Sequence, residues 1–206
     1  MTKHILVLSG TPKAHSFSTA LADTYADSAQ QHHEVRSFHI ADMVFDPDLS
    51  EGYSQDQPLE PDLQAFQQAL EWADHFVITT PIWWGALPAK LKGAFDRILL
   101  PGFAFSYKKK DTLNTKLTAK LFDGASFPNK LLSGKSARII MTMDGPAWYY
   151  RYFQGAPALR QLQISTLEFC GFKNIRHNML GPIKHSSESQ RQRWLSLMAQ
   201  LGTQGV

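Results

Sequence analysis

Short apolar runs alternate with amphipathic segments along most of the chain. The clearest runs are His4 to Ser9, His75 to Ile78 and Ala137 to Met143, each of the length of a buried strand. Weaker strand patterns lie at Val35 to Ile40 and at Ile175 to Met179. Because strands that alternate with helices are typical of βαβ units, the pattern predicts an α/β protein with a five-stranded parallel sheet.

The segments between these runs have helical spacing, with apolar residues three or four positions apart. We expect helices to begin near Ser16, Asp62, Pro88, Pro157 and Ser187. Asp62 is expected to be an N-cap, Ser187 to open a capping box with Gln190, and Gly171 to end the helix that starts at Pro157. The residues expected to face the core are Phe17, Leu21, Tyr25, Leu63, Phe66, Leu70, Ala73, Leu91, Phe95, Ile98, Leu99, Leu159, Leu162, Thr166, Phe169, Trp194, Leu197, Met198 and Leu201.

These elements predict a three-layer domain with strand order 2-1-3-4-5, in which a crevice opens between strands 1 and 3. The 206 residues fit one domain, 1–206, with a loop at 42–61 and an extra segment at about 102–136 before the fourth strand. The single cysteine, Cys170, fits a reducing compartment. Apolar runs are too short for a membrane helix, so we expect a cytoplasmic protein with no membrane insertion.

Charge is distributed unevenly along the chain. Residues 1–80 hold 3 Lys and Arg against 12 Asp and Glu, whereas residues 90–138 hold 11 against 3. A basic segment can meet an anionic ligand, a nucleic acid or the acidic half of a second subunit, and a solvated face is an equally good interpretation. No nucleic-acid-binding motif accompanies the charge, so we expect no nucleic-acid partner.

The loop from Gly10 to Ser18 follows the first strand and enters a helix. It carries hydroxyls, Lys13 and His15 at a helix N-terminus, a combination that favours an anion site. It has neither the dinucleotide glycine fingerprint nor the Walker lysine pattern, which argues against a Rossmann dehydrogenase or a P-loop enzyme. An ordinary capped helix start is the competing interpretation.

Two further loops follow predicted strands and carry aromatic residues. Pro81 to Gly85 holds two adjacent tryptophans, which suit a flat aromatic ligand, and Thr142 to Tyr150 holds a turn followed by a tryptophan and two tyrosines. Adjacent residues of an extended segment point opposite ways, so Trp83 and Trp84 cannot both cover one ligand face. For one of them, core packing or a subunit contact is the better interpretation.

Together these loops and three shorter motifs resemble the flavodoxin-like NAD(P)H:quinone oxidoreductases of the DT-diaphorase type and their bacterial relatives. The most specific motifs are Pro81-Ile82-Trp83-Trp84 with Pro88 and Leu91-Lys92-Gly93, then Gly102-Phe103-Ala104-Phe105-x-Tyr107, then Cys170-Gly171-Phe172. Their order and spacing cover nearly the whole chain. The resemblance implies a flavodoxin-like fold and a bound flavin.

The resemblance also implies roles for individual residues. Those implied to bind the flavin are Thr11, His15, Ser16, Phe17, Ser18, Pro81, Ile82, Trp83, Trp84, Gly85, Thr142, Met143, Asp144 and Gly145. Phe105 and Tyr149 are implied to bind substrate, and Tyr150 falls near the family's active-site tyrosine. Asp144 departs from the family's Thr-Thr-Gly-Gly turn, and we expect its carboxylate to point away from the flavin because that charge would oppose the reduced ring. Ala156 follows Gln154-Gly155 where the family carries a histidine soon after, so a tyrosine–histidine proton relay is not expected.

From this resemblance we expect an enzyme that transfers hydride from NAD(P)H to a quinone-like acceptor in two alternating half-reactions. FMN is the expected cofactor with FAD as the alternative, and no metal site is expected. The extra segment implies a homodimer that shares its active sites. A flavin-binding regulatory subunit of a transporter is the alternative function. The net positive charge of the chain argues against a one-electron carrier protein, because such carriers are usually acidic.

Overall fold

A five-stranded parallel sheet forms the centre of the protein. The structure is a computed structural model that describes residues 2–107 and 128–206. The strands are β1 (His4–Ser9), β2 (Glu34–His39), β3 (His75–Pro81), β6 (Ser136–Thr142) and β7 (Lys173–Leu180). Their order is β2-β1-β3-β6-β7, which confirms the predicted order 2-1-3-4-5 and the flavodoxin-like fold.

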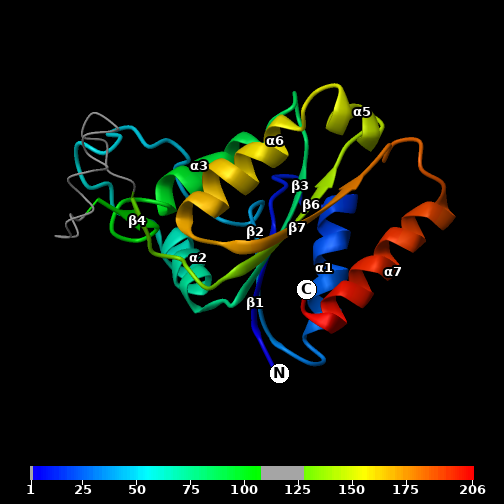
Figure 1. Cartoon of the computed structure of the whole chain (residues 1–206), viewed down its shortest axis with the longest axis horizontal. Helices are drawn as coiled ribbons and strands as arrows, with labels where there is room; N and C mark the ends of the chain where they lie inside the picture. Colours follow the sequence, from blue (N-terminus) through cyan, green and yellow to red (C-terminus); the bar gives the residue numbers. More distant parts are fainter. Residues whose placement is uncertain (1, 108–127) are drawn as a thin grey trace, which may run out of the picture.

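Helices cover both faces of this sheet (Figure 1). The long α1 (Phe17–Ala29) and α7 (Glu188–Gln204) lie together on one face, while α2 (Pro61–Trp72), α3 (Ala89–Ile98) and α6 (Pro157–Arg160) lie on the other. Along β3, Phe76 and Ile78 join the core on one face and Val77 joins the core on the other. A strand buried on both faces needs apolar residues at successive positions, which is why β3 was clear in the sequence. The edge strand β2 is mostly exposed, which explains its weak pattern.

One helix prediction was wrong in detail. The N-cap of α2 is Glu60, with Pro61 as the first helical residue, and the Asp62 carboxylate instead accepts a hydrogen bond from the Val44 amide. In the last helix, which Ser187 caps as expected, only Met198 of the predicted stripe is fully buried. Trp194, Leu197 and Leu201 pack at the margin of the core.

The helix that starts at Pro157 changes its winding. After α6 it continues as a π-helix, η1 (Gln161–Glu168), in which Thr166 Oγ1 donates to the Gln161 carbonyl at 3.1 Å. Hydrogen bonds of a π-helix join residues five apart, which is the spacing of Leu162 and Leu167, and Leu167 rather than Thr166 is buried. Gly171 ends the helix as expected, with φ +118° and its amide on the Leu167 carbonyl.

The predicted extra segment is described only at its two ends. β4 (Phe105–Ser106) pairs antiparallel with β5 (Asn129–Lys130), and Lys108 to Lys110 lie outside the described residues. Across the described ranges, no helix combines the length and apolar character needed to span a bilayer. In this topology the chain leaves β1 toward one edge of the sheet and β3 toward the other, so their carboxyl ends open a crevice.

Candidate functional site

The loop from β1 to α1 places hydroxyls at a helix N-terminus. Ser16 is the N-cap of α1, and its Oγ accepts the Thr19 amide at 3.1 Å. Thr11 is buried and its hydroxyl accepts the Lys13 amide at 3.3 Å. Ser18 is also buried, and its hydroxyl has no hydrogen-bond partner among the described residues. A buried hydroxyl without a partner is costly, so Ser18 is suited to a ligand that supplies one.

The loop from β3 to α3 forms a tight hairpin around the two tryptophans. Trp83 and Ala86 exchange both backbone hydrogen bonds, at 3.0 and 2.9 Å. Between them, Trp84 has φ +52° and Gly85 has φ +74°, the positive angles that a two-residue hairpin turn requires. Trp84 is fully exposed and Trp83 is half-exposed. A bulky residue at positive φ stores backbone strain, which is common at binding sites.

The third loop is fastened to its neighbours by backbone hydrogen bonds. The Ile82 amide donates to the Thr142 carbonyl at 2.9 Å, and the Met143 amide donates to the Leu180 carbonyl at 3.0 Å. Asp144 Oδ1 accepts the Lys184 amide at 3.1 Å. The loops after β3, β6 and β7 therefore meet at one edge of the sheet.

These loops enclose a crevice of about 250 Å³ at the carboxyl ends of β1, β3 and β6. Its lining residues are Thr11, Lys13, Ser16, Phe17, Ser18, Pro81, Ile82, Trp83, Thr142, Met143, Asp144 and Ile183. Ten of the implied flavin residues line it, whereas His15, Trp84, Gly85 and Gly145 lie in the same loops without lining it. Lys13 and Ile183 were missing from the implied set. The rule that ligands gather at strand carboxyl ends could have found Ile183, because its loop follows β7.

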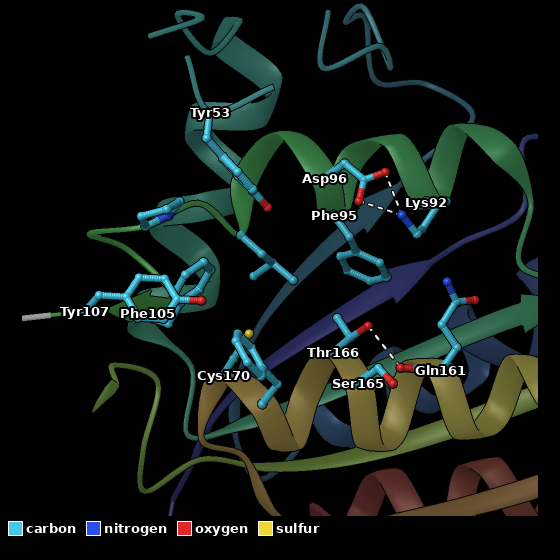
Figure 2. Close-up of a pocket in the computed structure, with 13 residues that line it drawn as sticks. Tyr53, Lys92, Phe95, Asp96, Phe105, Tyr107, Gln161, Ser165, Thr166 and Cys170 are labelled. Carbon is cyan, nitrogen blue, oxygen red and sulfur yellow. Dashed lines mark hydrogen bonds and ion pairs between the residues drawn. The ribbon is translucent and has the colours of Figure 1, made fainter. Parts of the chain in front are cut away.

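A second cavity, of about 600 Å³, lies between α3 and η1, and it holds Phe105 (Figure 2). Phe105 meets Tyr107 and Phe169 edge-on, with ring centroids 5.5 and 5.2 Å away. Lys92 and Asp96 form an ion pair at its rim, at 2.6 Å. Cys170 also lines it, and burial raises the pKa of this thiol to about 11. Phe105 therefore lines this second cavity and not the crevice.

Tyr150 lies in the core rather than on the crevice wall. It is 4% exposed, and its hydroxyl accepts the Ala158 amide at 2.9 Å, at the start of α6. Burial raises the pKa of this phenol. Tyr149 is exposed and stacks on Phe153 with ring centroids 5.5 Å apart. In this structure the environment of Tyr150 is that of a structural residue.

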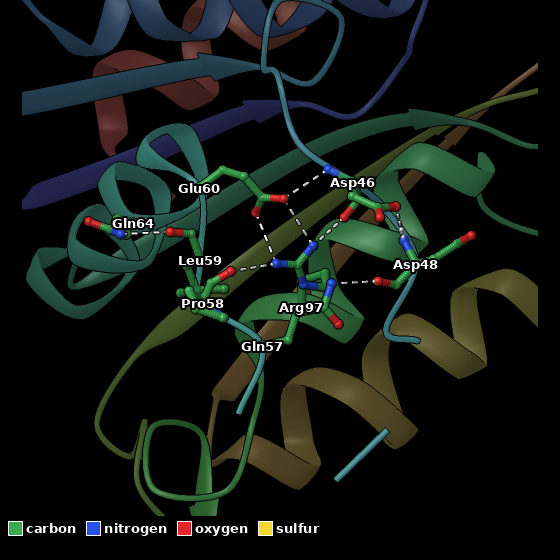
Figure 3. Close-up of polar contacts among 8 residues, drawn as sticks. All are labelled: Asp46, Asp48, Gln57, Pro58, Leu59, Glu60, Gln64 and Arg97. Carbon is green, nitrogen blue, oxygen red and sulfur yellow. Dashed lines mark hydrogen bonds and ion pairs between the residues drawn. The ribbon is translucent and has the colours of Figure 1, made fainter. Parts of the chain in front are cut away.

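A buried arginine holds the segment before α2 against α3 (Figure 3). Arg97 Nη2 donates to Glu60 Oε2 at 2.9 Å and to the Pro58 carbonyl at 2.8 Å, and Nη1 donates to the Asp46 carbonyl. Burial alone would raise the pKa of Glu60, but hydrogen bonds from the Asp46 amide, its own amide and Arg97 lower it. The same segment brings Tyr53 to the rim of the second cavity.

The crevice has the donors that a phosphorylated ligand needs. The N-terminus of α1 supplies a positive dipole end, and the unpartnered Ser18 hydroxyl lies beside it. Within the described part of the chain, the amides of Trp84 and Gly85 donate no hydrogen bond, so they remain available to a ligand. A flat ring with a phosphate tail fits this set of groups.

Solved structures with the same architecture include a Streptococcus mutans protein, Smu.1420. It is 25% identical with a TM-score of 0.77, and the alignment covers 97% of this chain and 98% of that one. An NAD(P)H:quinone oxidoreductase from Methanothermobacter marburgensis is 21% identical with a TM-score of 0.76, covering 98% and 96%. A Bacillus anthracis FMN-dependent NADH-azoreductase in complex with FMN is 16% identical with a TM-score of 0.70, covering 99% of both chains. At the lower identities this likeness shows the fold alone.

Sequence relatives extend the comparison. A Haemophilus influenzae protein named uncharacterized NAD(P)H oxidoreductase is 24% identical over 96% of this chain and 92% of its own length. Rat NAD(P)H dehydrogenase [quinone] 1 is 31% identical over 65% of this chain, and mouse ribosyldihydronicotinamide dehydrogenase [quinone] is 33% identical over 69%. The chain spans about half the length of these two rodent relatives, 44% and 56%. The names of these relatives agree with the resemblance found in the sequence. Residues 3–198 match the family described as Flavodoxin-like fold, and the chain belongs to that family.

Proposed function

We propose that this protein is a flavin-dependent NAD(P)H oxidoreductase that reduces quinones or similar acceptors. The observation that carries the proposal is the buried, unpartnered Ser18 hydroxyl beside the N-terminus of α1, in a crevice that Trp83 borders. A phosphate at this point satisfies Ser18 and interacts favourably with the helix dipole. The names of the rat, mouse and Haemophilus influenzae relatives support the same activity.

We propose FMN as the cofactor, with FAD as the alternative. In this assignment Thr11, Ser16 and Ser18 hold the phosphate side, while Pro81, Ile82 and Trp83 lie along the ring. When bound, a flavin would supply the chemistry of hydride transfer between NAD(P)H and the acceptor. Trp84 and Gly85 do not line the crevice, but their amides donate no hydrogen bond within the described residues, and we propose that they stabilise negative charge at the edge of the ring without a charged side chain. The protein thus contributes binding, orientation and backbone electrostatics.

We propose a homodimer with shared active sites, and the small size of the crevice supports this proposal. Ligand sites usually measure roughly 300–1,000 Å³, and the crevice measures about 250 Å³. Beside it, exposed aromatic side chains gather on the hairpin and on α5 (Ala147–Tyr152) and just after it. They are Trp84, Trp148, Tyr149, Tyr152 and Phe153. Such a patch favours burial against another molecule. We propose that a second copy covers it and brings Phe105 of its own second cavity toward the substrate.

We propose that donor and acceptor use the same site over the ring in turn. This is the alternating, two-step course that we propose for the reaction. Cytoplasmic location remains a prediction from the single cysteine.

The test is to purify the protein and record its visible spectrum, and then to identify the released cofactor by mass. We expect a yellow protein that releases FMN and oxidises NAD(P)H rapidly when a quinone is added. Light scattering should give the mass of two chains. Colourless protein that takes up neither FMN nor FAD would contradict the proposal, as would a flavoprotein that fails to oxidise NADH or NADPH with any quinone.

A further inference from the structure

The crevice carries two opposite charges at separate points of its wall. Among the described residues that line it, Lys13 and Asp144 are the only ones with charged side chains. Lys13 lies in the loop after β1, and Asp144 lies in the loop after β6. Strand β3 separates β1 from β6 in the sheet, so these loops start about 10 Å apart, two strand spacings. The crevice is therefore electrically asymmetric.

Asp144 is held in place by the loop that follows β7. Its Oδ1 accepts the Lys184 amide at 3.1 Å, and the Ile183 amide donates to the Met143 carbonyl at 3.0 Å. The two loops are in close contact, because a Cβ atom on Gly181 would lie 2.6 Å from the Gly145 carbonyl oxygen. Although its side chain is exposed to solvent, Asp144 is thus fixed among the residues that line the crevice, whereas the sequence led us to expect a carboxylate that points away from the flavin.

The two charges indicate how a phosphorylated ring compound would be oriented in the crevice. The phosphate is attracted to the α1 N-terminus and Lys13, which leaves the ring toward β3, β6 and Asp144. Hydride transfer delivers two electrons and one proton to a flavin, while NAD(P)H becomes NAD(P)⁺. The ring then bears one more negative charge than before. A carboxylate nearby opposes that charge, whereas it acts less on the neutral oxidised ring.

We infer that Asp144 tunes the bound flavin, because its charge weakens binding of the reduced form relative to the oxidised form and lowers the reduction potential. This inference rests on the proposed function. It assigns Asp144 a role in making the reduced enzyme a stronger donor to its acceptor. The side chain faces solvent, so salt screens part of the effect.

The test compares wild type with Asp144→Asn, in which the amide oxygen can still accept the Lys184 amide. The dissociation constants of oxidised and reduced FMN and the midpoint potential are measured in each protein. We expect the ratio of the reduced to the oxidised constant to fall by about threefold to about tenfold. A tenfold fall corresponds to a potential about 30 mV higher for a two-electron couple. The difference should shrink when the salt concentration is raised from about 10 mM to about 1 M.

Two matched variants complete the experiment. Asp144→Glu keeps the charge and should keep a potential close to that of wild type. Asp27→Asn removes an exposed carboxylate about 15 Å along α1 from its N-terminus and should leave the potential unchanged. If FMN binds and Asp144→Asn shifts the potential no more than Asp27→Asn, the inference is wrong while the proposed function stands. If neither the wild type nor any variant binds flavin, the inference and the proposed function are both wrong.

Discussion

The two cavities of this protein are built in different ways. The crevice between β1, β3 and β6 is made of loop backbone, hydroxyls and a helix N-terminus, and the topology of the sheet places all of them. The larger cavity between α3 and η1 is made of aromatic side chains that meet across helices and a two-stranded hairpin. A site made of backbone at strand ends can be located from the order of elements, whereas a site made of packed side chains depends on long-range contacts.

The largest expected effect loosens the segment before α2, whose Tyr53 borders the second cavity, and leaves the crevice intact. Arg97→Met removes a guanidinium that is 1% exposed, leaves the Asp46 and Pro58 carbonyls without this donor, and leaves the Glu60 carboxylate without its cationic partner. We expect the free energy of unfolding to fall by about 3–5 kcal/mol. Denaturant unfolding measures this change.

Lys92→Met on the same helix is the matched control, because Lys92 forms an exposed ion pair with Asp96. It should cost less than about 1 kcal/mol. In the folded fraction of Arg97→Met, the affinity for FMN should match that of wild type. A large loss of that affinity would show that the two cavities are not independent.

A smaller expected effect distinguishes a structural role of Tyr150 from a catalytic one. Tyr150→Phe leaves the Ala158 amide without its acceptor, so we expect a loss of about 1–3 kcal/mol in the free energy of unfolding. Turnover per bound flavin should stay within about twofold of wild type, and Tyr149→Phe on the exposed face should change neither quantity. A hundredfold fall in kcat at unchanged stability would instead give Tyr150 the active-site role that the family resemblance implied.

A substitution in the hairpin beside the crevice should stabilise the protomer, whereas the substitutions above destabilise it. Trp84→Asn places a residue that tolerates positive φ at the turn, so the isolated protomer should gain about 1 kcal/mol in stability. The exposed indole is lost at the same time, so the dissociation constant of the dimer should rise. Thermal unfolding at low protein concentration and sedimentation at increasing concentration measure the two changes. A destabilised protomer with an unchanged dimer would refute both assignments.

The smallest expected effect is on the binding of the quinone substrate alone. Phe105→Leu keeps the second cavity apolar but removes the flat ring, which should raise KM for quinone by a few-fold. The affinity for FMN should not change, because Phe105 does not line the crevice of its own protomer. Steady-state kinetics with a quinone and fluorescence titration with FMN distinguish these quantities. An equal loss in both would contradict the shared-site proposal.

The sequence predicted the sheet, its order and most of the crevice because these depend on local pattern. Apolar runs such as His75 to Ile78 must be buried strands, and loops after parallel strands must meet at one edge. It did not predict the π-helical winding at Thr166, the core position of Tyr150 or the use of Asp62 to bind the Val44 amide. Each of these depends on which hydrogen-bond partner a side chain finds, and the spacing of apolar residues does not reveal that partner. The second cavity was missed as a cavity for the same reason, although Phe105 was named.

The central claim is that Ser18 and the α1 N-terminus hold a phosphate in the crevice. It is tested most directly by the affinities of FMN and riboflavin, which differ by that phosphate, in wild type and Ser18→Ala. Because a hydrogen bond to a charged group contributes about 1.5–3 kcal/mol, the variant should lose about tenfold or more in affinity for FMN and less than about twofold for riboflavin. Ser196→Ala, on the exposed face of α7, is the control. Equal losses for both ligands, or none for either, would contradict the account.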